Sequence, residues 1–214
     1  TPIRSSAASD VYKRQLCELI ERPQKYDLSS FEKVKANVNE KIYEKSDCDD
    51  FPMKPQRIVS DIRKIMGYHD IIALDNGVYK IWFARNYKAF QPNTILLDNA
   101  LATMGAGLPS AMMAAMLFDK RKVLAICGDG GFMMNSQELE TAVRYNLNLV
   151  CIVLNDNSYG MIRWKQSHAG FADWGLEYKN PDFIKYAESY GASGHRISSV
   201  DNFFEVLQNS FKEG

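Results

Sequence analysis

The chain has 214 residues, of which 46% are hydrophobic and 24% are charged, and its 26 Lys and Arg residues balance 26 Asp and Glu residues. This length is enough for one main domain with a buried core. The average composition excludes collagen and extended disorder, and the even, scattered charge argues against a nucleic-acid partner. The longest apolar stretches, such as residues 108–118, are shorter than the roughly 20 residues of a membrane span, so we expect no membrane partner.

The cysteines and the start of the chain bear on the cellular compartment. The four cysteines show no CxxC spacing, and Cys127 and Cys151 lie within apolar runs, where a thiol behaves as a small hydrophobic group. No charged segment followed by an apolar core of roughly 7–15 residues opens the chain, so no secretory signal is predicted. We therefore expect a reduced, cytoplasmic setting.

The first fifty residues differ in pattern from the remainder. Residues 1–15 have little periodicity and are similar to translated library-adaptor sequence, so we interpret them as a non-native or disordered start. Residues 16–45 have a charged helical pattern with two apolar faces, formed by Leu16, Leu19 and Ile20 and by Phe31, Val34, Val38 and Ile42. Two prolines and three aspartates in residues 46–56 predict a linker, which places a domain boundary near residue 50.

Beyond the linker, short apolar runs alternate with helical patterns. We predict strands at 71–74, 95–97, 123–127 and 149–154, and helices at 57–66, 109–117, 136–145, 181–190 and 201–211. This alternation predicts an α/β fold with a mainly parallel sheet between two helical layers. Asn180 and Pro181 favour a helix start, and Gly191 favours a left-handed stop. Because a strand should follow the last helix, we expect a partial chain that is cut at both ends.

Residues 122–160 carry the most informative pattern. One apolar run ends in Gly128-Asp129-Gly130-Gly131, a helix follows, and a second run ends in 155–158, Asn-Asp-Asn-Ser. This pattern is one βαβ unit, whose usual length is about 30 residues. If the two strands are neighbours, Asp129 and Asp156 emerge at the same carboxyl edge of the sheet, where open α/β folds bind ligands. Either turn alone could equally be an ordinary surface turn.

Two carboxylates at one edge predict a cation between them, because like charges in a small space are unfavourable. Oxygen ligands suit Mg²⁺, which commonly takes one or two carboxylates together with phosphate oxygens. Gly130 and Gly131 permit close backbone approach, and the N–H groups that open the next helix favour an anion. The pattern therefore predicts a metal-bridged diphosphate.

The spacing of Gly128-Asp129-Gly130 and Asn155-Asp156 resembles the thiamine-diphosphate motif. The resemblance covers about residues 51–214 and is closest to acetolactate synthases of the catabolic, pyruvate-using kind, on stretches such as LATMGAGLPSA, GDGGFMMNSQELETAVR and LNDNSYGMI. It implies the thiamine-diphosphate-binding fold for 51–214 and the tail of a middle domain for 16–50. Asp156 stands where Asn is commoner, which adds charge but retains an oxygen ligand.

The resemblance also implies roles for individual residues. The metal ligands would be Asp129, the Asp156 side chain and the Ser158 backbone carbonyl. Met104 would be the bulky catalytic-site residue that bends the cofactor, with the backbone of Ala102 and Met104 binding its pyrimidine ring. The remaining cofactor-binding residues would be Gly77, Val78, Tyr79, Gly128, Gly130, Gly131, Tyr159, Gly160 and Met161. Tyr79 stands where the family usually has His.

For the parent protein, the resemblance implies thiamine diphosphate and Mg²⁺ as cofactors. The presence of FAD stays open, and a flavin of the family would contact the middle domain. Pyruvate would be decarboxylated and condensed with a second 2-keto acid to give acetolactate. The full-length chain would form a homodimer or homotetramer. The Glu that activates the cofactor would lie in a separate domain of the neighbouring subunit, so this chain alone should be inactive.

Three alternatives remain open. The parent protein could be another thiamine-diphosphate 2-keto-acid decarboxylase or carboligase, or this chain could be a non-catalytic remnant that binds Mg²⁺ and diphosphate. The stretch 105–110, GAGLPS, could instead indicate an NAD-dependent oxidoreductase, although Ser110 replaces the third glycine of that fingerprint and small residues also pack a helix onto a sheet.

Trp164 is interpreted either as a substrate contact or as a half-buried helix residue. Lys165 occupies the usual Trp position of biosynthetic relatives, which favours pyruvate as the substrate.

Overall fold

The computed structural model describes residues 16, 18 and 27–212. The chain divides into two units between Lys41 and Ile42. Helix α2 (Ser29–Tyr43) begins in the first unit and ends just past its boundary, and none of its residues is buried. The helical pattern predicted for residues 16–45 is therefore confirmed for 29–43, with Phe31, Val34 and Val38 exposed. The predictions for residues 1–15, Leu19 and Ile20 lie outside the described residues.

The second unit is built on a parallel sheet. Within the described residues, this sheet has the order β2-β1-β3-β4 and contains β1 (Ile71–Leu74), β2 (Ile95–Leu97), β3 (Val123–Gly128) and β4 (Val150–Leu154). Every pairing between these neighbours is parallel. The predicted strands are confirmed to within one residue at each end. Both faces of the central strands are covered, which explains why they read as continuous apolar runs.

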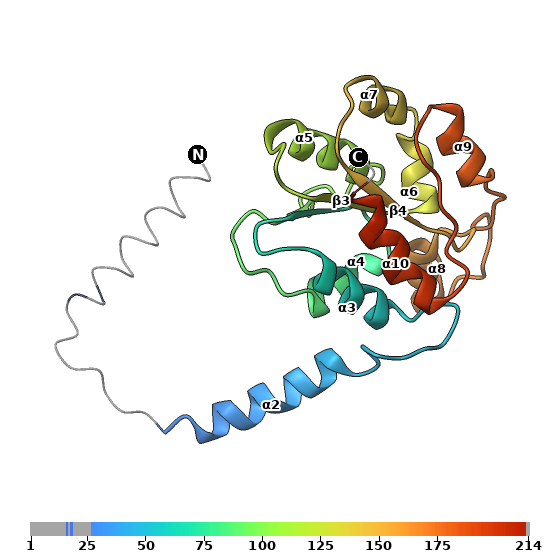
Figure 1. The fold of residues 1–214 in the computed structure, drawn as a ribbon. Coiled ribbons are helices and arrows are strands. Elements are labelled where there is room, and N and C mark those ends of the chain that lie inside the picture. Colours follow the sequence, from blue (N-terminus) through green and yellow to red (C-terminus); the bar gives the residue numbers. More distant parts are fainter. Residues whose placement is uncertain (1–15, 17, 19–26, 213–214) are drawn as a thin grey trace. The chain divides into compact units, whose positions relative to one another are not determined.

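Two helical layers cover the sheet (Figure 1). The first core cluster joins one face to α5 (Gly107–Leu117), α6 (Asp129–Met134), α7 (Glu138–Arg144) and α9 (Phe183–Ser189). The second joins the other face to α3 (Pro55–Ile65), α4 (Tyr79–Asn86) and α10 (Val200–Ser210). Strand β3 alternates between them, with Val123, Ala125 and Cys127 in the first cluster and Leu124 and Ile126 in the second. The predicted three-layer α/β/α fold is thus confirmed.

Some local predictions are wrong. Helices α4 and α6 were not expected, because α6 has only six residues and α4 has an irregular apolar pattern. Asn180 does not cap the helix that follows it. Asp182 does so instead, by accepting a hydrogen bond from the Ile184 N–H at 3.0 Å. Gly191 has the expected left-handed conformation, with φ of 87°.

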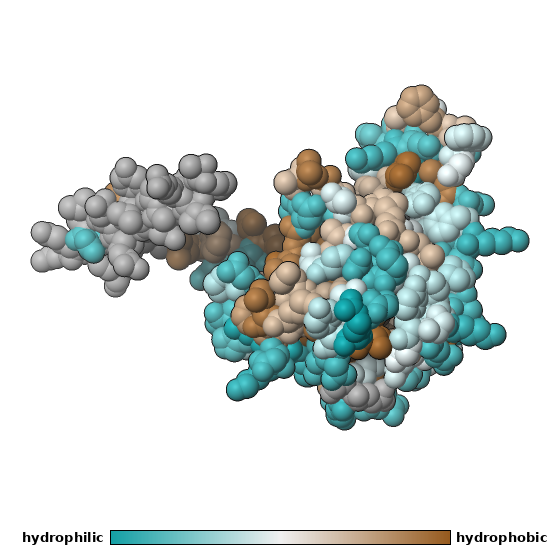
Figure 2. Space-filling view, turned by 90° about the horizontal axis from the view of Figure 1, so that it is seen from above, coloured by the Kyte–Doolittle hydropathy of each residue, from teal (hydrophilic) through white to brown (hydrophobic). Residues whose placement is uncertain are grey.

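The surface of the second unit is mixed. Figure 2 shows hydrophobic patches among hydrophilic side chains. The most exposed large hydrophobic residues are Leu101 and Trp174, whose exposed fractions are 87% and 84%. No helix among the described residues is long and apolar enough to span a membrane.

Candidate cofactor site at the carboxyl edge of the sheet

The two predicted acidic turns lie side by side. Strands β3 and β4 are parallel neighbours, and Gly128 at the end of β3 pairs in register with Leu154 at the end of β4. Asp129 follows directly after β3, and Asp156 lies two residues after β4. The prediction that both turns leave the sheet at one edge is therefore confirmed.

Asp129 is almost completely buried, with 2% of its surface exposed, and both of its carboxylate oxygens accept hydrogen bonds. Its Oδ1 accepts from the Gly130 N–H at 2.8 Å and from the Tyr178 hydroxyl at 2.9 Å. Its Oδ2 accepts from the Asn157 N–H at 2.7 Å and from the Asn180 side-chain amide at 2.6 Å. These four donors hold the Asp129 carboxylate in one orientation.

Asp156 has a more open setting. Its Oδ1 accepts from the Ser158 N–H at 3.1 Å. Burial raises the pKa of the Asp156 carboxyl and the nearby charge of Asp129 raises it further, while the Ser158 N–H and Arg163 act in the opposite direction. A cation bound between the two carboxylates would relieve the effect of the Asp129 charge on Asp156.

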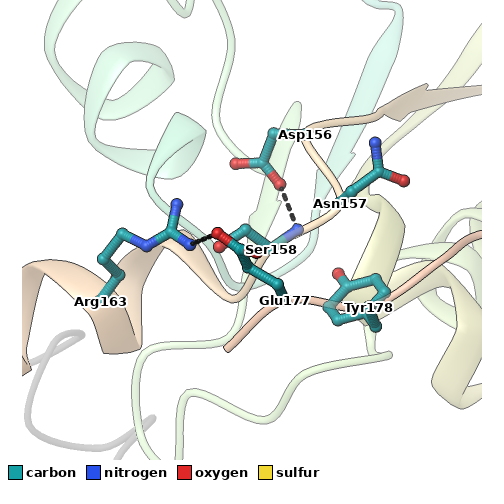
Figure 3. A pocket seen from close by; sticks show the side chains of 6 residues that line it. All are labelled: Asp156, Asn157, Ser158, Arg163, Glu177 and Tyr178. Carbon is teal, nitrogen blue, oxygen red and sulfur yellow. Dashed lines mark hydrogen bonds and ion pairs between the residues drawn. The ribbon is translucent and has the colours of Figure 1, made fainter. Parts of the chain in front are cut away.

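A cavity of about 270 Å³ opens beside Asp156, lined by the six residues in Figure 3. Arg163 on α8 (Gly160–His168) donates a hydrogen bond to Glu177 at 3.0 Å, and Tyr178 follows Glu177 in the chain. The cavity is therefore bounded by the turn after β4, by α8 and by the segment around Glu177. Its lining is polar and charged.

The donor set fits a hard cation such as Mg²⁺, because it consists of carboxylate and backbone oxygens. Within the described part of the chain, no group of three or more His, Cys, Asp or Glu side chains could hold a metal ion. A cation here would therefore rely on Asp129 and Asp156, with backbone oxygen and ligand oxygens completing its coordination. Ser158 is buried, and its hydroxyl has no hydrogen-bond partner.

Side chains of the same chain pack against the glycines of the GDGG turn. A side chain on Gly130 would meet the Tyr178 hydroxyl at 2.5 Å and the Tyr159 ring at 2.7 Å, and one on Gly131 would overlap Asp75. A side chain on Gly128 would come within 3.1 Å of the Tyr79 ring, which also covers Gly77. Packing within the chain thus already requires small residues here. Contact of these glycines and of Tyr79 with a ligand stays a prediction.

The turn that carries Ala102 and Met104 is held by side chains from the ends of β1 and β2. The side-chain amide of Asn76 donates to the Thr103 carbonyl at 2.7 Å, and the Thr103 N–H donates to Asp98 Oδ2 at 3.2 Å. Ala102 has a left-handed φ of 51°, so its backbone conformation is an unusual one for alanine. The structure thus fixes the backbone of this turn at the same edge of the sheet as the acidic turns.

An apolar cavity of about 450 Å³ lies between α4 and α8. Three of the residues predicted to bind cofactor line it, namely Val78, Gly160 and Met161, together with Trp82 and Trp164. Trp164 is 58% exposed and stacks on His168, with ring centroids 5.8 Å apart. This cavity could accept an apolar part of a ligand, and the second interpretation of Trp164, a half-buried helix residue, also agrees with its exposure.

Residues 75–214 match the family described as thiamine pyrophosphate enzyme, C-terminal TPP binding domain. The chain belongs to this family. The match begins at Asp75, directly after β1, and includes both acidic turns. This family match leaves the NAD-dependent alternative for residues 105–110 without support. These residues instead pack the start of α5 against β1 and β3, and Gly107 lies close to Asp75 and Cys127.

Curated relatives of this thiamine pyrophosphate enzyme domain include several acetolactate synthases. The chain is 36% identical over 154 residues to an acetolactate synthase of Bacillus subtilis, covering 72% of this chain and 27% of the relative. It is 35% identical over 158 residues to a catabolic acetolactate synthase of Raoultella terrigena, covering 74% of this chain and 28% of the relative. The resemblance found in the sequence is confirmed, and the chain spans less than a third of the length of these relatives.

A solved structure supports the fold. The thiamine diphosphate-dependent 4-hydroxybenzoylformate decarboxylase of Rhodococcus jostii RHA1 superposes with a TM-score of 0.71 and 22% sequence identity. The match covers 75% of this chain and 30% of that chain. The thiamine-diphosphate-binding fold predicted for residues 51–214 is therefore shown for the greater part of the chain.

Sequence analysis missed three residues that the structure brings to the site of this domain. Asp75 follows β1 as Asp129 follows β3, so the strand-end argument could have identified it. Tyr178 and Asn180 come from a segment about fifty residues after Asp129, and no spacing pattern connects them to it. Only the folded chain shows that both donate to the Asp129 carboxylate.

Proposed function

We propose that this chain is the cofactor-binding part of a thiamine-diphosphate- and Mg²⁺-dependent enzyme that decarboxylates pyruvate and condenses it with a second 2-keto acid to give acetolactate. The observation that carries the proposal is the pair of acidic turns after neighbouring strands β3 and β4, in a chain whose curated relatives include acetolactate synthases. In this proposal Asp129, Asp156 and the Ser158 carbonyl hold Mg²⁺, and the cation holds the diphosphate.

Thiamine diphosphate supplies an electron sink for the decarboxylation of a 2-keto acid, and the protein supplies position and charge. The donors around Asp129 would hold its carboxylate in one orientation at the edge of the sheet. The turn held by Asn76 and Asp98 would present Met104 and the backbone of Ala102 to the pyrimidine ring. Val78, Gly160 and Met161 would shield the reacting centre from water along the apolar cavity.

The other parts of the proposal concern the parent protein. We infer a homodimer or homotetramer of the full-length chain, in which the neighbouring subunit supplies the activating Glu. We also infer a cytoplasmic setting and pyruvate as the donor substrate. FAD, if the parent protein holds it, would bind outside residues 51–214.

Calorimetric titration of the full-length protein tests the cofactor. Thiamine diphosphate is expected to release or absorb heat only when Mg²⁺ is present, and NAD is expected to give no signal. Heat from NAD alone, or no heat from thiamine diphosphate with Mg²⁺, would overturn the proposal. The Asp129→Ala variant, which lacks one metal ligand, serves as the negative control.

A second experiment tests the reaction. The full-length protein is expected to convert pyruvate into acetolactate and CO₂, whereas the isolated chain is expected to show no turnover. Release of CO₂ without acetolactate would favour the alternative, another thiamine-diphosphate 2-keto-acid decarboxylase. Turnover by the isolated chain would contradict the proposed role of a second domain.

A further inference from the structure

The side-chain amide of Asn180 joins the two acidic turns. Its Nδ2 lies 2.6 Å from Asp129 Oδ2, 2.9 Å from Asn155 Oδ1 and 3.0 Å from Asn157 Oδ1. Asp129 belongs to the turn after β3, whereas Asn155 and Asn157 belong to the turn after β4. An amide nitrogen carries two hydrogens, so three acceptor oxygens share two N–H groups. One of the three bonds can therefore be released without leaving an N–H group unpaired.

The carboxylate of Asp129, by contrast, has no acceptor position to spare. Its two oxygens offer about four lone-pair positions and accept four hydrogen bonds, from Gly130, Asn157, Tyr178 and Asn180. A cation that binds Asp129 must replace one of these donors. The Gly130 and Asn157 donors are backbone groups of the turns themselves. Asn180 is the donor that can be replaced most easily, because its N–H groups stay paired with Asn155 and Asn157.

We propose that Asn180 is a positioning residue for the metal site. It holds Asp129 in one orientation before the cation binds, and its N–H groups hold Asn155 and Asn157 of the β4 turn after the cation has taken its place on Asp129. This inference rests on the proposed function, because it concerns the proposed Mg²⁺ ligand Asp129. Neither the thiamine-diphosphate motif nor the helix-capping pattern assigns this role to Asn180.

Tyr178 provides the matched comparison. Its hydroxyl donates to Oδ1 of the same carboxylate, and its ring packs against Tyr159 with centroids 4.8 Å apart. Among the hydrogen bonds of the described residues, its hydroxyl makes only this one, and its backbone N–H donates to the Asn157 carbonyl of the β4 turn at 3.3 Å, a bond that Y178F retains. Removing this hydroxyl deletes one donor to Asp129, whereas removing the Asn180 amide deletes a donor to Asp129 together with the bonds to Asn155 and Asn157 of the β4 turn.

The test compares N180A and Y178F in the full-length protein, with binding of thiamine diphosphate and Mg²⁺ followed by calorimetry. N180A is expected to bind about tenfold more weakly than the wild type, within the range usual for residues that orient metal ligands. Y178F, which keeps the Asn180 bonds to both turns, is expected to lose less affinity than N180A. N180S, whose hydroxyl can donate one bond, is expected to lie between N180A and the wild type.

Two further measurements separate positioning from general destabilisation. Titrations at rising Mg²⁺ concentration should diminish the loss in N180A, because excess cation compensates for a weakened metal site, and circular dichroism should show an unchanged fold. Mn²⁺ alone, followed by electron paramagnetic resonance, should also bind N180A more weakly than the wild type. A loss that is independent of Mg²⁺ concentration would overturn the inference.

The outcomes also distinguish this inference from the proposed function. If the wild type binds thiamine diphosphate with Mg²⁺ and N180A binds equally well, the inference fails and the proposed function stands. The inference also fails if Y178F loses as much affinity as N180A, because the bonds of Asn180 to the β4 turn would then be irrelevant. If the wild type shows no binding, both fail together.

Discussion

The carboxylate of Asp75 lies against the α-carbon of Gly131, so closely that a side chain on Gly131 would overlap an Asp75 oxygen. Asp75 is fully buried, and it accepts hydrogen bonds from the backbone N–H groups of Asn76, Gly105 and Ala106 at 2.7–3.2 Å. Burial raises the pKa of Asp75, while these N–H groups act in the opposite direction. One buried carboxylate thus connects the end of β1, the turn before α5 and the GDGG turn.

Gly131→Ala is expected to destabilise the chain, because Asp75 cannot move aside without losing its backbone donors. Overpacking of this kind typically lowers the free energy of unfolding by about 1–3 kcal/mol. Urea unfolding followed by circular dichroism measures the change. The control is Gly160→Ala, whose added side chain would meet Asp156 Oδ2 and Val78 Cγ2 at 3.3 Å, so that a small shift suffices. Equal losses in the two variants would contradict the role of Asp75.

Asp156→Asn is expected to stabilise the metal-free chain. Burial and the charge of Asp129 raise the pKa of the Asp156 carboxyl, so its charged form is unfavourable, and the substitution removes that charge. Asp156 is exposed, so the gain in the free energy of unfolding should stay below about 1 kcal/mol. An amide oxygen can still bind a cation, so calorimetry should detect binding of thiamine diphosphate and Mg²⁺.

The matched variant Asp129→Asn should behave in the opposite way. Asp129 is buried and accepts four hydrogen bonds, so an amide NH₂ there would face donors rather than acceptors. Loss of a buried hydrogen bond to a charged group costs about 1.5–3 kcal/mol. Urea unfolding should therefore show Asp129→Asn to be less stable than Asp156→Asn, and the reverse order would argue against the described roles.

Ser158→Ala is expected to leave both stability and cofactor binding almost unchanged. The Ser158 hydroxyl is buried and has no hydrogen-bond partner, so its removal relieves an unpaired polar group. The proposed metal ligand is the backbone carbonyl, which the substitution retains. Thermal unfolding and calorimetry with thiamine diphosphate and Mg²⁺ check both expectations. A large loss of binding would show that the hydroxyl, rather than the carbonyl, acts at the site.

The fold was predictable because its signals are local. Each strand is a short apolar run, and the alternation with helical patterns selects a parallel sheet. Helix α6 was missed because its six residues begin inside the GDGG turn, which sequence patterns assign to a loop. Asn180 was assigned to a helix cap because Asn before Pro commonly starts a helix, but here Asp182 is nearer to the first N–H groups of α9.

The site was predictable only in part, for a related reason. Asp129 and Asp156 each follow a strand, and the neighbouring order of β3 and β4 brings them to one edge. Tyr178 and Asn180 reach Asp129 because the chain returns after α8, as the bridge between Ser158 and Glu177 shows. The path of such a loop depends on tertiary packing, which leaves no periodic pattern in the sequence.

The stability of the chain is expected to fall in alkaline solution through Tyr87. Burial raises the pKa of the Tyr87 hydroxyl to about 12, although the charge of Arg63 lowers it and that of Asp70 raises it. Because the folded-state pKa lies above the unfolded value near 10, the stability is fully present below pH 10 and is lost as the pH rises toward 12. A difference of about two pKa units corresponds to a loss of at most about 3 kcal/mol.

Urea unfolding between pH 8 and 12 tests this expectation with Tyr87→Phe. The variant should be less stable at pH 8 by about 1 kcal/mol, because the Arg63 guanidinium loses an acceptor 2.7 Å away. Between pH 10 and 12 the variant should lose less stability than the wild type, because its side chain cannot ionise. Tyr68→Phe is the control, since Tyr68 is 54% exposed. Parallel pH profiles for the wild type and Tyr87→Phe would show that the buried hydroxyl does not govern alkaline unfolding.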